Sequence, residues 1–315
     1  MVELRPKSSF DDFVSTCTPL LKIPELEEQM RARVREIVAE LLNFQPDADP
    51  AKNLRQFLQK DKDFLGVLLA ITNLSQEKFL RILSAKRFAN GDFGREWDAE
   101  RVYRKIRTDD TFAETIAGLF LEGRDNRLLV EQVADFYLDQ LSLPANWPEF
   151  IRDQNIVANV VRKKLTGEYT DQKGECIERI VRGVLDGVGG RHGIAHTRGQ
   201  VSFLAKQVDH VIPSLENPYI MVMVSYMETT SSGQTARANE QQGMYEKVVG
   251  EDTRWAPRKC VFVNIVDGAG WLARRSDLRK MHAGCDYCLN MKTLDQLEAI
   301  ICRYVPERYF QNPPS

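Results

Sequence analysis

The sequence lacks a long apolar run and a recognisable export signal. The longest nearly uncharged apolar run, residues 219–227, is much shorter than the roughly 20 residues with which a helix crosses a bilayer. The first ten residues, MVELRPKSSF, contain no apolar core of a signal peptide. We therefore expect a cytoplasmic protein with no membrane partner.

The sequence also lacks the dense cysteine spacing of a disulfide-stabilised domain. Its cysteines are spread over 315 residues, which is typical of reduced thiols: Cys17, Cys176, Cys260, Cys285, Cys288 and Cys302. Cys285 and Cys288 form a Cys-x-x-Cys pair near His282, which is a zinc-site pattern when a second pair accompanies it. Because no second pair stands at a suitable spacing, we expect buried thiols here and no disulfide.

The net charge of the chain is close to zero. The 43 Lys and Arg residues against 45 Asp and Glu give a net charge of -2, so the field of the whole protein does not attract a polyanion. Binding to nucleic acid would therefore need local clusters of basic residues. The apolar fraction of 43% is that of a folded protein with a buried core, and the length favours two structural units.

Hydrophobic spacing divides the chain into two parts. Residues 1–165 have apolar residues at helical spacing and no strand-like alternation, which predicts an all-helical domain. This domain carries no functional motif, and clamping of DNA and dimerisation are both open roles for it. Residues 166–315 carry β-branched and aromatic runs between helical segments, which predicts an α/β (α+β) domain. Strands are expected at residues 201–204, 207–212, 219–226 and 259–266, and helices at residues 174–185, at 237–249 and within 276–304.

One acid in an apolar strand is the first candidate for chemistry. The segment Lys206-Gln-Val-Asp-His-Val-Ile212 places Asp209 among the apolar residues of an expected strand. Carboxylates in such a position can hold a divalent cation, which polarises a phosphodiester and generates hydroxide from bound water. The alternative is a structural role, in which Asp209 caps a turn or pairs with Lys206.

Two more acids extend this candidate site. Glu228 follows the apolar strand expected at residues 219–226, so two neighbouring strands would each present an acid. Glu178 lies beside apolar positions of the helix expected at residues 174–185 and can point toward the sheet. Its alternative is a solvated ion pair with Arg182, one helical turn further on.

At these residues the chain resembles the DpnII/MboI-like type II restriction endonucleases. The similar segments are, in order, Ser9-Phe-Asp-Asp-Phe-Val-Ser-Thr16, Gly174-Glu-Cys-Ile-Glu-Arg-Ile-Val181, Lys206-Gln-Val-Asp-His-Val-Ile212 and Val266-Asp-Gly-Ala-Gly-Trp271 followed by Leu278. The resemblance implies a PD-(D/E)XK nuclease core, in which helices flank a mixed central sheet. It also implies Mg²⁺-dependent cleavage of double-stranded DNA by a homodimer, with Asp209 as the first metal ligand and Glu178 as the acid of the preceding helix.

The second catalytic strand departs from the family pattern. The family has an acid, one intervening residue and a polar residue in this strand, whereas residues 222–226 contain no acid. Strand side chains alternate, so Glu228 would share the required face if the strand continued. We therefore expect Glu228 as the replacement metal ligand, Thr230 in the place of the motif lysine and Gln234 as a further polar residue. The alternative is a weakened or lost site.

Basic and polar residues around these acids are expected to contact DNA. Residues 191–196, at the end of a glycine-rich run, suit phosphate contact, and residues 229–240 are rich in side chains that bond to phosphates and base edges. A plain surface loop and a linker are the alternatives. The expected DNA contacts are Arg191, Arg198, Lys206, Ser231, Ser232, Gln234, Arg237 and Asn239.

Together these features predict a type II restriction endonuclease that cuts a short specific sequence. One alternative is a repair or anti-phage nuclease of the same fold without strict sequence specificity. Another is a non-catalytic DNA-binding module on a degenerate nuclease scaffold.

Overall fold

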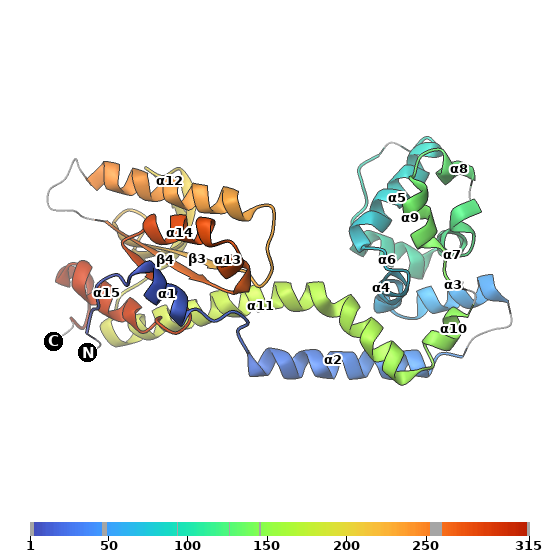
Figure 1. Cartoon of the computed structure of the whole chain (residues 1–315), viewed down its shortest axis with the longest axis horizontal. Coiled ribbons are helices and arrows are strands. Elements are labelled where there is room, and N and C mark those ends of the chain that lie inside the picture. The colour runs from blue at the N-terminus through green and yellow to red at the C-terminus, as the bar shows by residue number, and fades with distance from the viewer. Residues whose placement is uncertain are drawn as a thin grey trace. The chain divides into compact units, whose positions relative to one another are not determined.

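The computed structural model describes residues 3–45, 49–92, 94–125, 127–144, 146–252 and 260–313 (Figure 1). The chain divides into two compact units, one of Pro24–Asp171 and one of Met1–Ile23 together with Gln172–Ser315. None of the helices in the described part is long and apolar enough to span a membrane.

The unit Pro24–Asp171 is made of helices, and its described residues contain no strand. The elements are α2 (Pro24–Leu42), α3 (Pro50–Lys60), α4 (Lys62–Ile71), α5 (Gln76–Ala89), α6 (Ala99–Thr108), α7 (Asp110–Glu122), η1 (Gly123–Asp125), α8 (Arg127–Val130), α9 (Asp135–Leu141), α10 (Trp147–Phe150) and the first part of α11 (Gln154–His192). Polar residues before several of these helices accept backbone N–H groups, as Asp61 does for α4 and Ser75 for α5. Their apolar faces enclose a core that includes Phe57, Phe64 and Phe120.

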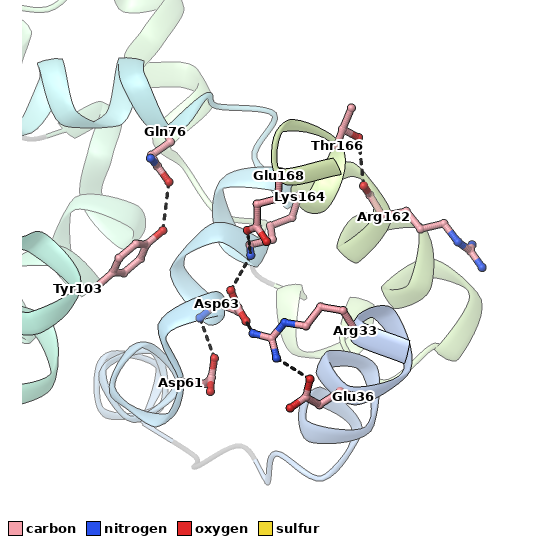
Figure 2. A network of polar contacts seen from close by, with 10 residues as sticks. All are labelled: Arg33, Glu36, Asp61, Asp63, Gln76, Tyr103, Arg162, Lys164, Thr166 and Glu168. Atoms are coloured by element: carbon pink, nitrogen blue, oxygen red, sulfur yellow. Dashed lines mark hydrogen bonds and ion pairs between the residues drawn. The ribbon is translucent and has the colours of Figure 1, made fainter. Parts of the chain in front are cut away.

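A polar network ties three helices of this unit together (Figure 2). Asp63 in the first turn of α4 is buried and forms ion pairs with Arg33 of α2 and Lys164 of α11. Lys164 Nζ lies 2.5 Å from Asp63 Oδ1 and 2.5 Å from Glu168 Oε1. A buried carboxylate needs such partners because an uncompensated charge in the interior is costly. The network therefore fixes how α2, α4 and α11 pack.

The other unit contains a five-stranded mixed sheet in the order β1-β2-β3-β4-β5. Its strands are β1 (Thr197–Val201), β2 (Lys206–Pro213), β3 (Pro218–Tyr226), β4 (Val261–Asp267) and β5 (Tyr287–Leu289). The first three strands pair antiparallel, and β3, β4 and β5 pair parallel. The mixed sheet agrees with the predicted fold class. The strand expected at residues 201–204 is wrong, because the chain turns there after β1, and β5 was not predicted.

Helices cover the sheet on both faces. They are α1 (Phe10–Thr16), the second part of α11, α12 (Gln234–Asp252), α13 (Ala269–Ala273), α14 (Arg275–Ala283), α15 (Gln296–Tyr304) and the short η2 (Glu307–Tyr309). In Figure 1, α12 and α14 lie on one side of the strands and α11 on the other. A core of buried residues that includes Phe13, Met221, Phe262 and Trp271 fills the space between the sheet and the α12–α14 side.

The first 23 residues belong to this sheet-containing unit, which differs from the predicted division at residue 165. Phe13 is part of the core beside the sheet, and the backbone N–H of Thr18 donates to Asp267 Oδ1 at 2.6 Å. Asp267 also accepts the N–H groups of Gly268 at 2.8 Å and Met291 at 3.0 Å. Burial raises the pKa of this carboxyl. One buried side chain thus joins three segments that are far apart in the sequence.

The chain after β3 packs closely against the turn after β4. The carbonyl oxygen of Met227 accepts the N–H of Gly270 at 2.8 Å. Gly268 has φ +106°, and a Cβ atom there would lie 2.2 Å from the same carbonyl oxygen. Only glycine fits this backbone conformation and this approach. The path of the chain beyond the end of β3 is therefore fixed by backbone contacts.

Candidate active site

Glu178 and Asp209 lie in one pocket of about 290 Å³. The pocket lies between α11 and the β1–β2 hairpin of the sheet-containing unit. Its lining residues are Glu178, Arg182, His196, Thr197, Arg198, Asp209 and His210. The structure thus brings together the helix acid and the strand acid that the sequence analysis selected.

A register shift in the hairpin brings Asp209 and Arg198 together. The pairing of β1 with β2 is irregular between Thr197 and Gly199, so that Asp209 and His210 of β2 face the single residue Arg198 of β1. Such a β-bulge disturbs the regular alternation of side chains and re-aims them. The bulge explains how an acid and its neighbouring histidine both line the same pocket.

Asp209 uses its two carboxylate oxygens differently. Oδ2 accepts the backbone N–H of Val224 in β3 at 2.9 Å, and Oδ1 lies 3.7 Å from Arg198 Nη2. The alternative pairing with Lys206 is not found, because Lys206 Nζ lies 2.6 Å from Glu240 Oε1. Asp209 is therefore held by the neighbouring strand while one oxygen stays directed to the pocket.

Arg198 also contacts the second acid. Its Nη1 lies 3.7 Å from Glu178 Oε2, so one guanidinium spans the carboxylates of Glu178 and Asp209. The side chains of Arg198 and Glu178 are about half exposed, at 51% and 50%, and that of Asp209 is 20% exposed. Glu178 therefore pairs with Arg198, and the alternative pair with Arg182 is not formed.

Two histidines continue the pocket on one side. His196 Nε2 lies 2.8 Å from Asp186 Oδ1, and His196 Nδ1 lies 3.3 Å from His210 Nδ1. If His196 donates to Asp186, its Nδ1 accepts from His210, which leaves His210 Nε2 as an acceptor. Burial, followed by the charges of His196, Arg182 and Arg198, lowers the pKa of His210 to about 4. His210 is therefore neutral at neutral pH.

The sequence analysis did not select these histidines as site residues. His210 directly follows Asp209, and its only signal was a polar residue in an apolar strand. No residue pattern in the sequence of the hairpin marks the bulge that turns it to the pocket.

Glu228 does not line this pocket, which corrects its predicted place beside Asp209. β3 ends at Tyr226, and Glu228 lies beyond it in an ion pair with Lys173 of α11. The Lys173 side chain is only 4% exposed. Tyr226 donates its hydroxyl to Glu228 Oε1 at 2.9 Å, and burial raises the pKa of that hydroxyl to about 12. Glu228 is thus already held by a buried ammonium group and a phenol.

Two further predicted residues are not part of the pocket. Thr230 is exposed beyond the end of β3 and does not line it. Gln234 is fully buried at the first residue of α12, where its Oε1 accepts the N–H of Ser231 at 2.9 Å. This buried side chain closes a helix terminus and is not accessible to a ligand in this structure.

The remaining predicted DNA contacts lie in three places. Arg198 is in the pocket, and the exposed Ser231 and Ser232 precede α12. Arg191 is in the last turn of α11, not in a glycine-rich loop, and its guanidinium binds both oxygens of Glu298 at 2.9 and 2.7 Å.

The third place is a groove of about 790 Å³ along α12. Three basic side chains, Lys206, Arg237 and Lys247, line it together with Asn239 and Glu240. The groove also includes small residues, so a ligand can approach the helix backbone there. Lys206 pairs with Glu240 within the groove, and Arg237 and Lys247 are its other basic residues.

The pocket contains two carboxylates of the kind that can bind a magnesium ion. Mg²⁺ is commonly bound through one or two carboxylates, with waters and substrate phosphates as the other ligands. Glu178 and Asp209 supply two such carboxylates. Over the described part of the chain, no three His, Cys, Asp or Glu side chains are placed to hold a metal ion together. The predicted ligand set of Asp209, Glu228 and Glu178 is therefore not assembled as a group.

The pocket lies in a segment that matches a known protein family. Residues 158–299 match the family model of the DpnII restriction endonuclease. Over these residues the chain is DpnII-like. The DpnII-like segment includes both pocket acids and the hairpin that carries Arg198, and it confirms the resemblance found in the sequence. Neither the curated proteins nor the solved structures gave a match.

Proposed function

We propose that this chain is a type II restriction endonuclease with a PD-(D/E)XK core, which hydrolyses phosphodiester bonds of double-stranded DNA at a short specific sequence with Mg²⁺. One observation carries the proposal. Within a DpnII-like segment, a helix acid and a strand acid, Glu178 and Asp209, converge on one pocket together with basic groups.

In the proposed mechanism, Glu178 and Asp209 hold the cation. Mg²⁺ bound there would polarise the phosphoryl oxygen and lower the pKa of a bound water. Arg182 and Arg198 provide charged hydrogen-bond donors for the phosphate in the same pocket. The neutral His210, oriented by His196, supplies an acceptor that can align a water molecule.

The groove along α12 provides the proposed DNA-binding surface. Phosphate contacts by basic residues supply most of the sequence-independent affinity, while groups such as Asn239 and Arg237 can read base edges. A homodimer would place one such site on each strand of a symmetric sequence. The exposed Ser231 and Ser232 at the start of α12 would then face DNA.

Cleavage of unmethylated phage DNA with Mg²⁺ tests this proposal. We expect sharp bands from the wild type and a loss of at least about 100-fold in D209N and E178Q, because second-layer partners of a metal ligand already cost 10–100-fold. Glu175→Gln is the matched control, since Glu175 is exposed on the same helix but does not line the pocket.

The same assay separates the alternatives. Smeared digestion would support a nuclease without strict specificity. Intact DNA under Mg²⁺ and Mn²⁺, combined with DNA binding, would support a non-catalytic module and refute the enzymatic proposal.

A further inference from the structure

Arg198 stands between the two acids at the position where a cation would bind. Its two terminal nitrogens lie 3.7 Å from Glu178 Oε2 and 3.7 Å from Asp209 Oδ1. Arg182 lines the same pocket, but it forms no ion pair with either acid. A single guanidinium thus compensates two carboxylates that come from different elements.

This arrangement has a physical cause. Two carboxylates directed to one pocket repel each other, and a cation between them lowers that repulsion. Without a metal ion, Arg198 supplies the compensating charge. A divalent cation that binds both carboxylates must displace it.

The displacement is easy because Arg198 lies on an exposed edge. β1 is the outermost strand of the sheet, and the Arg198 side chain is 51% exposed. Ion pairs between groups that are half exposed contribute little, so each pair weakens metal binding by no more than about fivefold. The long side chain can move toward solvent without breaking a core contact.

We propose that Arg198 is a positioning residue that occupies the cation site in the metal-free protein and moves to the DNA phosphate when the metal binds. The inference rests on the proposed function, because it assumes that Glu178 and Asp209 hold the metal. It adds a coupling: the metal releases Arg198 for the phosphate, and the phosphate draws Arg198 away from the acids. Metal and DNA therefore favour each other's binding.

Metal binding without DNA tests the first half. Mn²⁺ is titrated into the full-length protein, and free Mn²⁺ is followed by electron paramagnetic resonance. We expect Arg198→Gln to bind Mn²⁺ about three- to tenfold more tightly than the wild type, because the competing cation is gone. Arg198→Lys should lie between the two, since one ammonium group cannot span both acids as a guanidinium fork does. Arg303→Gln, an exposed arginine of α15, should leave the affinity unchanged.

DNA affinity tests the second part of the proposal, the move of Arg198 to the phosphate. Here Arg198→Gln is expected to weaken binding, whereas it is expected to tighten metal binding. With Ca²⁺ in place of Mg²⁺ to hold the complex before cleavage, Arg198→Gln should weaken DNA binding by about tenfold, the loss of one charged phosphate contact. The proposed exchange of Arg198 between the metal ligands and the phosphate predicts these two opposite effects.

The inference fails if Arg198→Gln leaves the Mn²⁺ affinity within twofold of the wild type or lowers it, while Asp209→Asn still lowers it more than about tenfold. That result would leave the proposed function intact. If neither the wild type nor Asp209→Asn binds Mn²⁺, with DNA or without it, the proposed metal site itself is wrong.

Discussion

The ion pair between Lys173 and Glu228 yields the sharpest prediction, because it separates a structural acid from a metal ligand. Glu228→Gln removes the negative charge that compensates a lysine side chain with 4% exposure. Breaking a buried pair on one side costs about 3–5 kcal/mol, and we take the lower end because the Glu228 side chain is 14% exposed. For a domain of this size, about 3 kcal/mol lowers the melting temperature by roughly 6–12 °C.

Thermal unfolding followed by circular dichroism measures this loss, and Mn²⁺ titration on the same samples measures metal binding. We expect Glu228→Gln to unfold at a lower temperature than the wild type and to bind Mn²⁺ with the affinity of the wild type. The double variant K173M/E228Q should lose less stability than the sum of its single variants, since the two residues interact. Glu175→Gln serves as the exposed control on α11. An E228Q variant with an unchanged melting temperature and no metal binding would refute this reasoning and restore Glu228 as a ligand.

Three further predictions concern stability. The pKa of His210, lowered from 6.5 to about 4, makes the folded state favour the neutral imidazole, so its stabilising effect is present above pH 6.5 and is lost as the pH falls toward 4. In urea unfolding, the free energy of unfolding of the wild type should fall by about 2–3 kcal/mol because of this group between pH 7.5 and 4.5, and His210→Gln should lack this loss. An identical pH dependence in both proteins would exclude this effect of His210. Asp63→Asn should destabilise the helical unit by about 3 kcal/mol, because it removes the buried negative charge that Arg33 and Lys164 share, and a urea midpoint unchanged from the wild type would argue against the network. Gly268→Ala should cost more than about 2 kcal/mol from the close approach at φ +106°, whereas Gly118→Ala, with open space inside α7, should stabilise by about 0.5–1 kcal/mol; equal effects in calorimetry would contradict this.

The larger elements of the sheet were predictable from the sequence. β2, β3 and β4 lie within two residues of their expected bounds, because long β-branched runs mark buried strands. The short β5 and the edge strand β1 carry no such run. The helix expected at residues 174–185 continues to His192, since the glycines that were expected to end it allow close packing: a Cβ at Gly189 would lie 2.8 Å from the carbonyl oxygen of Ile194.

The site was predictable by residue type but not by partner. Glu178 and Asp209 were selected because a charged side chain among apolar residues is costly and indicates a specific role. The fold brings the two together. Their roles as Mg²⁺ ligands stay predictions. The partners of Glu228 were missed because Lys173 is 55 residues away along the chain, and only the packing of α11 on the sheet brings the two into contact. The spacing of residues along the sequence therefore does not predict such a pair.

The division of the chain has a consequence for its synthesis. Residues 24–171 are contiguous, so the helical unit can fold as soon as it leaves the ribosome. The first 23 residues cannot reach their native contacts at that point, because the N–H of Thr18 donates to the carboxylate of Asp267, which lies 249 positions later in the chain. At a synthesis rate of about 10 residues per second, the N-terminal segment waits on the order of 25 s for Asp267 to be made. Phe13 therefore cannot reach its native place until the later elements that it contacts are made, and these include His282 of α14.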